Sequence, residues 1–167
     1  ALSPTITNTP FTCQERANAQ YILQPTGYTA LSGDATFANG RVAALQHKAR
    51  VYAENFGVLA DSSDVSVAFN LFITYLKTTG SSGNLPKGEI YAKNLRLEGG
   101  TKAWSMYGAG KKLTKIRHVD GEGTLIIGNN GSTVGYHLEG FTIDCRYSEL
   151  SPSAANNGLS LADTSDV

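Results

Sequence analysis

Apolar positions with helical spacing stand out most clearly between residues 65 and 79. Ser62, Ser63 or Asp64 is placed to cap the N-terminus of this segment, and Gly80 lies just past its expected end. The pattern predicts a helix over 65–79 whose broad apolar face must cover another part of the molecule. Six apolar residues follow the i, i+3, i+4, i+7 rule: Val65, Ala68, Phe69, Phe72, Ile73 and Leu76.

Short apolar runs separated by Gly, Asn and Asp turns follow Pro86 and predict a series of short strands. The last three runs start at residues 124, 140 and 158, which are 16 and 18 residues apart. This spacing predicts stacked repeat units that share one continuous apolar core. The predicted strands are 89–91, 95–97, 105–107, 115–116, 124–127, 140–143 and 158–161, with inward apolar pairs Leu125/Ile127, Phe141/Ile143 and Leu159/Leu161 in the last three.

Residues 1–34 are rich in Thr, Pro, Asn and Gly and predict a small head of short strands or extended segments. Alternation appears at 5–7 and 21–23, and turns are expected at 25–27 and 32–34. The segment has too little apolar mass for an independent core. We therefore expect it to pack on copies of itself or on a larger particle.

Residues 35–50 are interpreted as a neck, with a short helix from Gly40 to Lys48. Phe37, Val42, Leu45 and Ala49 recur at roughly helical spacing, although Asn39-Gly40 interrupts them. The narrow apolar stripe suits packing against symmetry mates, and it equally suits a helix that lies on its own chain.

Composition agrees with a turn-rich β protein of 167 residues. Charged residues make up 17% of the chain, below the roughly 25% of ordinary domains, and glycine occurs 18 times. Residues 87–117 hold eight Lys/Arg against two Glu, a net charge of +6, whereas residues 118–167 have a net charge of −6. We interpret both as solvated surfaces. No basic cluster is interleaved with stacking aromatic residues, so no nucleic-acid partner is expected. The basic residues are Lys87, Lys93, Arg96, Lys102, Lys111, Lys112, Lys115 and Arg117.

No cofactor or metal is expected. Cys13 and Cys145 have no metal or redox spacing and are interpreted as free, largely buried thiols. His47, His118 and His137 also lack the spacing of metal ligands. No apolar run approaches the ~18 residues of a membrane span, so no membrane insertion is expected, and no signal peptide is visible at the start.

Five short pieces, taken in order, resemble the entry module of right-handed parallel β-helix proteins of the pectate-lyase-like superfamily. They are Asn55-Phe56-Gly57, the Asp61/Asp64 stretch, Leu85-Pro86-Lys87-Gly88-Glu89-Ile90-Tyr91, Tyr107-Gly108-Ala109-Gly110 and Leu138-Glu139-Gly140-Phe141-Thr142-Ile143-Asp144. Residues 58–64 depart from the Gly-Asp-Gly and paired acids of that family.

The resemblance implies a mostly β fold in three parts. A small N-terminal head (1–34) and a short helical neck (35–50) precede the helix-capped first coils of a right-handed parallel β-helix (51–167). The 65–79 helix would close the end of the coils and cover their backbone edges. Because the chain stops inside a coil, we expect it to be the front end of a longer protein.

The superfamily includes polysaccharide lyases, glycan hydrolases and bacteriophage tailspikes. A small head without an export signal is similar to the virion-attachment end of tailspikes. The resemblance therefore implies a homotrimer in the virion tail that binds a tail or adaptor protein through residues 1–50. Bacterial surface polysaccharide would be bound or degraded by coils beyond Val167. The alternative is a secreted polysaccharide lyase or glycoside hydrolase with no virion.

No catalytic or carbohydrate-binding residue is assigned, and no activity is expected of these 167 residues alone. Glycosidases use paired carboxylates, and Asp144 and Asp163 could approach each other one coil apart. They are instead interpreted as turn residues that accept backbone N–H bonds. Trp104 and Tyr107 fit either sugar stacking or packing in the core or at its rim. The other acids of this region are Glu139, Glu149 and Asp166.

Overall fold

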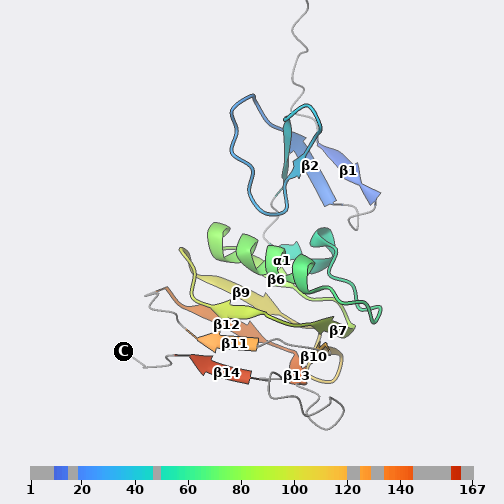
Figure 1. The fold of residues 1–167 in the computed structure, drawn as a ribbon, viewed down its shortest axis with the longest axis vertical. Helices are drawn as coiled ribbons and strands as arrows, with labels where there is room; N and C mark the ends of the chain where they lie inside the picture. The colour runs from blue at the N-terminus through green and yellow to red at the C-terminus, as the bar shows by residue number, and fades with distance from the viewer. Residues whose placement is uncertain are drawn as a thin grey trace, which may run out of the picture.

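The computed structural model describes residues 10–14, 19–46, 50–119, 125–128, 134–144 and 159–162. Within these residues one α-helix accompanies a much larger set of strands, which form four sheets (Figure 1). The prediction of a mostly β chain is confirmed.

Three parallel sheets form the larger part of the molecule, and every strand pair within them is parallel. Sheet I contains, in spatial order, β12 (Tyr136–Glu139), β9 (Trp104–Tyr107), β6 (Ser82–Asn84) and β5 (Arg50–Tyr52). Sheet II contains β13 (Thr142–Asp144), β10 (Thr114–His118) and β7 (Gly88–Ala92). Sheet III contains β14 (Leu159–Ala162), β11 (Leu125–Gly128) and β8 (Arg96–Glu98).

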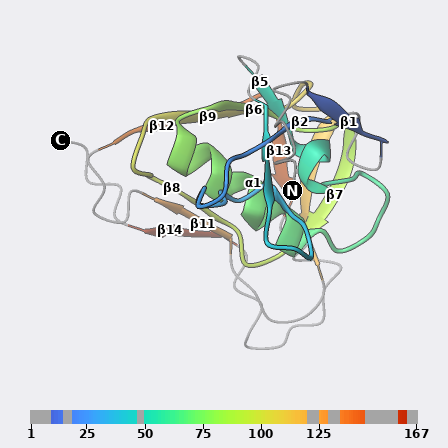
Figure 2. The ribbon, with the colours of Figure 1, turned by 90° about the horizontal axis from the view of Figure 1, so that it is seen from above.

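From β6 onward the chain visits sheets I, II and III in a fixed order, and it does so three times. The successive triplets are β6–β7–β8, β9–β10–β11 and β12–β13–β14. Viewed from above, the three sheets lie around α1 on three sides (Figure 2). Apolar residues of their strands, such as Ile90, Leu97 and Met106, are buried in one common core.

The predicted spacing of 16 and 18 residues is not the repeat of this stack. Leu125 of β11 pairs with Leu159 of β14, 34 residues later, whereas Thr142 of β13 pairs with Lys115 of β10 in sheet II. The predicted strand at 140–143 therefore belongs to a different sheet from the other two. The apolar alternation marks strands that face a core, but it does not distinguish one side of the core from another.

Helix α1 (Ser66–Thr79) confirms the predicted helix and lies across one end of the three sheets (Figure 1). Val65, rather than one of the predicted polar residues, occupies the N-cap position, while the Asp64 carboxylate accepts the Ser66 N–H at 2.9 Å. Gly80 ends the helix in the left-handed conformation with φ 74° and donates its N–H to the Leu76 carbonyl. The buried face comprises Phe69, Phe72, Ile73, Tyr75 and Leu76.

A 3₁₀ turn, η2 (Ala53–Phe56), joins β5 to the segment that leads into α1. It ends at Gly57, whose φ of 91° favours glycine. The Phe56 ring then packs on Phe72 and Tyr75 at centroid distances of 5.4 and 5.1 Å. Through Phe56, the turn therefore places an aromatic ring between α1 and the N-terminal head.

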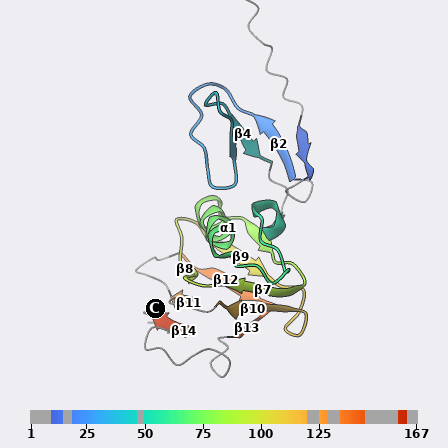
Figure 3. The same ribbon diagram turned by 45° about the vertical axis from the view of Figure 1, so that its right-hand side comes forward.

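The head is a four-stranded antiparallel sheet on the far side of α1 from the three parallel sheets (Figures 1 and 3). The turns predicted at 25–27 and 32–34 are confirmed, with turn residues at 26–27 and 32–33, and the alternation at 21–23 lies in a strand. Residues 5–7 lie outside the described residues. The strand order is β1 (Phe11–Cys13), β2 (Ala19–Leu23), β4 (Val42–Leu45) and β3 (Ala35–Thr36).

The predicted neck helix from Gly40 to Lys48 is wrong, because Val42–Leu45 form strand β4. All four residues of β4 are buried, and the strand pairs with β2 on one side and β3 on the other. The Asn39-Gly40 turn, with Gly40 at φ 76°, sends the chain back along β3 and excludes a helix at this point. Residues 35–45 therefore belong to the head sheet, while residues 47–49 lie outside the described residues.

The head shares a core with the rest of the chain. Tyr21 and Leu45 are buried in the same apolar cluster as Phe56 and α1. At Gly33 a Cβ atom would lie 2.4 Å from the Phe56 ring, so the loop before β3 lies directly on η2. The Asp34 carboxylate holds that loop by accepting the N–H groups of Leu31 and Leu45, both at 2.9 Å. The head thus packs on its own chain, a partner that the sequence did not indicate.

The contact between head and helix gives the protein an expected alkaline sensitivity at Tyr75. Burial raises the pKa of the Tyr75 hydroxyl above its ordinary value, and the nearby Asp34 adds to this shift. Because the folded state favours the neutral phenol, its contribution to stability is complete below the ordinary pKa of about 10 and is lost as the pH rises toward the raised value. Tyr75→Phe should therefore lose less stability than the wild type between about pH 8 and pH 11. Denaturant unfolding at both pH values measures this, and equal losses would contradict it.

Candidate functional site

The outward face of sheet I carries aromatic, hydroxyl, amide, basic and acidic side chains. Along each strand, alternate residues such as Val51, Gly83 and Met106 point inward and are buried. The remaining residues face outward and form two rows across the strands, because the pairing is in register. One row is Arg50, Ser82, Ser105 and His137, and the other is Tyr52, Asn84, Tyr107 and Glu139.

Contacts between these side chains organise the face around Tyr107. The Arg50 guanidinium lies over the Tyr107 ring at 5.6 Å from its centroid. The His137 ring lies 5.6 Å from the same ring on the neighbouring strand, and its Nε2 is 3.0 Å from Glu139 Oε2. Ser82 and Ser105 join their hydroxyls at 2.7 Å. We call these eight outward residues the sheet I face.

The outward face of sheet II is a network of ion pairs. Arg117 binds Glu89 at 2.9 Å through Nη1 and Asp144 at 3.1 Å through Nε, so it bridges the outer two strands of the sheet. Lys115 lies 3.5 Å from Glu89, and Tyr91 donates its hydroxyl to the same carboxylate at 3.0 Å. Hydrogen bonds from Arg117 and Tyr91 lower the pKa of the Glu89 carboxyl. The network links successive strands and leaves its two carboxylates engaged by cations.

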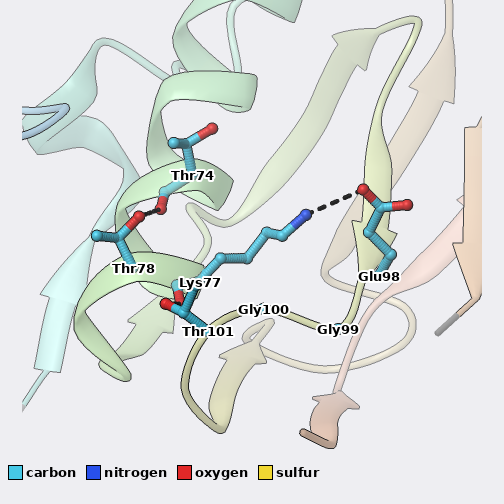
Figure 4. Close-up of a pocket in the computed structure, with 7 residues that line it drawn as sticks. All are labelled: Thr74, Lys77, Thr78, Glu98, Gly99, Gly100 and Thr101. Carbon is cyan, nitrogen blue, oxygen red and sulfur yellow. Dashed lines mark hydrogen bonds and ion pairs between the residues drawn. The ribbon is translucent and has the colours of Figure 1, made fainter. Parts of the chain in front are cut away.

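A shallow pocket of about 290 Å³ lies between the last turns of α1 and residues 98–101 (Figure 4). Lys77 extends across it to Glu98, with 3.1 Å between Nζ and Oε1. Glu98 is buried and also lies 3.4 Å from Arg96 Nε. The Thr101 hydroxyl donates to the Lys77 carbonyl at 3.1 Å. The Lys77–Glu98 ion pair and the Thr101 hydrogen bond join the end of α1 to residues 98–101. Because these polar groups bond to one another, we do not interpret the pocket as a binding site.

The structure describes only some of the predicted candidate residues, because Asp163, Glu149 and Asp166 lie outside the described residues. The interpretation of Asp144 as a turn residue is wrong: it is the last residue of strand β13 and pairs with Arg117. Trp104 is a core residue: it is buried, stacks on Tyr136 at 5.3 Å and donates its indole N–H to the Glu98 carbonyl. Tyr107 instead lies half-buried on the sheet I face. Core packing therefore accounts for Trp104, whereas the surface position of Tyr107 fits both rim packing and sugar stacking.

The basic residues predicted at 87–117 fall into two groups, those in ion pairs and those exposed in turns. Arg96, Lys115 and Arg117 take part in the ion pairs described above. Lys87, Lys111 and Lys112 are exposed in turns that follow β6 and β9.

Cys13 is free but only partly buried, while Cys145 and His47 lie outside the described residues. In the described part of the chain, no group of three or more His, Cys, Asp or Glu residues is arranged to hold a metal ion. No described helix has the length and apolar character needed to cross a membrane.

Sequence reasoning missed most of the sheet I face, including Arg50, Tyr52, Asn84 and strand β12. Arg50 and Tyr107 are 57 positions apart in the sequence, and only the register of β5, β6 and β9 brings them together. Comparisons with protein-family models, curated proteins and solved structures found no match to this chain.

Proposed function

We propose that residues 51–167 form the helix-capped start of a right-handed parallel β-helix. The observation that carries this proposal is the fixed order in which the chain visits sheets I, II and III, with parallel pairing in all three. The position of α1 supports it further, since a helix across the end of the stack covers strand edges that would otherwise recruit other chains. Among the described strands, β12, β13 and β14 are the outer strands of the three sheets, where further coils would add.

On this fold the chain acts as the attachment end of a bacteriophage tailspike. Two features support this role. The head sheet lies on the opposite side of α1 from the stacked sheets, so the two ends of the molecule are available to different partners (Figure 1). The head also exposes the large apolar side chains Phe11, Leu31 and Phe37, which suit contact with another protein.

The proposal assigns the partners as follows. The protein is a homotrimer in the virion tail, and residues 1–50 bind a tail or adaptor protein of the particle. Further coils of the same β-helix bind or degrade bacterial capsule or O-antigen. No catalytic role is proposed for Glu89 or Asp144, because both pair with Arg117.

The attachment role predicts that surface changes on the head release the protein from the particle without unfolding it. Phe37→Ser removes the most exposed of these side chains, so the protein should stay folded, with a stability loss below about 2 kcal/mol, while the amount bound to purified particles falls about tenfold or more. Val67→Ser, at an exposed position on α1, is the matched control and should leave binding unchanged.

Two results would contradict the attachment proposal. One is normal attachment to particles after deletion of residues 1–50. The other is a well-folded monomer in sedimentation experiments at micromolar concentration, which would exclude the homotrimer.

A further inference from the structure

The head sheet has an open edge on each side within the described part of the chain. Strand β1 is outermost on one side and β3 on the other. Neither strand contains a charged residue or a proline, which are devices that commonly protect edge strands from pairing. Each edge also carries an exposed aromatic ring, because Phe11 in β1 is 41% exposed and Phe37, directly after β3, is 44% exposed. Both edges are therefore suited to pairing with a further strand.

The backbone groups of Thr12 face the open edge of β1. Gln46 donates its N–H to the Gln20 carbonyl at 2.7 Å, so Gln20 turns its backbone groups toward the β4 side of β2. In an antiparallel pair, two residues that lie opposite each other either exchange both hydrogen bonds or both point away. Thr12 lies opposite Gln20. Its N–H and C=O therefore point away from β2.

The same alternation applies to Thr36 on the opposite edge. Phe37 donates its N–H to the Arg41 carbonyl at 2.8 Å, so the backbone groups of Phe37 point toward β4. Backbone groups alternate in direction along a strand, and those of Thr36 therefore point away from β4. Because every strand pair in the head is antiparallel, β1 and β3 also run in opposite directions. A second head placed beside the first in the same orientation would continue the antiparallel order.

We propose that β1 of one copy pairs with β3 of the next copy, so that the head sheets of the homotrimer form one closed ring. This inference rests on the homotrimer of the proposed function, and it names the surface that joins the heads. Placing Thr12 opposite Thr36 lets the two residues exchange both N–H···O=C bonds. The same register places Phe11 directly opposite Phe37. We call this contact between residues 11–13 and 35–37 the head seam.

A second copy of this chain fits both edges at once. Phe11 and Phe37 lie on the same face of the head sheet, the face that carries Tyr21 and Leu45, so their rings meet on one side of the seam. Each copy has one edge of each kind, which makes the contact heterologous, and a rotation that closes after three copies leaves no edge open. The loss of particle binding expected for Phe37→Ser would then arise from an opened ring.

The register of the head seam predicts a specific disulfide. Cys13 of one copy would lie opposite Ala35 of the next, as a pair without mutual hydrogen bonds whose Cα atoms are about 4.5 Å apart. Within one copy the two positions lie on opposite edges of the sheet, about 14 Å apart, which is too far for a disulfide. The full chain carrying Ala35→Cys and Cys145→Ser should therefore form a disulfide-linked trimer in oxidised glutathione, which non-reducing electrophoresis detects.

Three further chains, all with Cys145→Ser, make the disulfide test specific. The chain without Ala35→Cys should form no link. Thr36→Cys in place of Ala35→Cys should also form none, because alternate positions of a strand face opposite sides of the sheet. Thr12→Pro added to Ala35→Cys removes the outward N–H and should lower the yield of linked trimer about tenfold. This third chain should keep the circular dichroism of the folded protein, because β2 does not use that N–H.

Sedimentation of the same samples separates failure of the head seam from failure of the proposed function. A trimer of the Ala35→Cys chain without a disulfide between copies would overturn the seam and leave the homotrimer standing. The two edges would then be open to a strand of another protein. Equal linking of the Thr36→Cys chain would overturn the register, and linked species longer than three chains would overturn the closed ring. A folded monomer would overturn the homotrimer and the seam together.

Discussion

Phe72→Ala is expected to reduce the free energy of unfolding by about 3–5 kcal/mol. Phe72 has no exposed surface and lies at the centre of the contact between α1, η2 and sheet I. Its ring centroid is 5.4 Å from that of Phe56 and 6.3 Å from that of Phe69. Truncation removes the buried ring and leaves a cavity that the strands under the helix cannot fill without moving. Denaturant unfolding followed by circular dichroism measures the loss.

Val67→Ala on the same helix is the matched control, because Val67 is 78% exposed and its loss should change stability by no more than about 0.5 kcal/mol. Comparable effects at the two positions would mean that α1 is not docked on the sheets. The proposed role of α1 as the cover of the stack would then fail with it.

The helix was predictable because its signal is local. The apolar period of α1 extends over three turns, and the glycine that ends the helix lies directly after it in the sequence. The same local reasoning failed at Val42–Leu45, where helical spacing was also present but weaker. There the turn at Gly40 folds β4 back on β3, and pairing with β2, which lies in another segment, completes the strand. Propensity over a few residues does not decide between a short helix and a strand when tertiary pairing is available.

The strands after Pro86 were predictable individually but not as sheets. Alternating apolar residues identify a strand with one buried face, and this held for Ile90 and Met106. The sheet to which a strand belongs depends on how many residues each turn contains, and these turns vary. Strand β12 was missed because Leu138 is its only strongly apolar residue that points inward.

Only parts of the candidate site could be predicted from the sequence. The pairing register of β5, β6, β9 and β12 brings its residues together, and this register depends on contacts between distant segments. Basic residues were visible in the sequence, yet the sequence did not distinguish Arg117, which is neutralised by Glu89 and Asp144, from Lys111. Asp144 was a reasonable candidate for paired acids until the pairing of β13 with β10 placed it beside that arginine. Long-range pairing therefore determines which charges are available at the surface.

Gly83→Ala is expected to destabilise the protein by about 1–3 kcal/mol, although glycine in a strand is normally a weakness. A Cβ atom at this inward position of β6 would lie 2.3 Å from Phe72 Cζ and 2.8 Å from Leu76 Cδ1. Both neighbours are fully buried in the core, so neither can move away cheaply. The missing side chain at Gly83 thus leaves room for Phe72 and Leu76 of α1 to pack directly on sheet I.

The strongest test of this contact is the same substitution in the Phe72→Ala background. There the added methyl group enters the space left by the ring, so Gly83→Ala should become neutral or stabilising, with a coupling of about 1–3 kcal/mol between the two sites. Gly135→Ala is the matched control, because its Cβ would meet no atom within 4 Å, and its effect should be the same in both backgrounds. Additive effects of Gly83→Ala and Phe72→Ala in denaturant unfolding would show that the two residues are not in contact. Coupling would instead establish that α1 packs directly on the first strand pair of the stack.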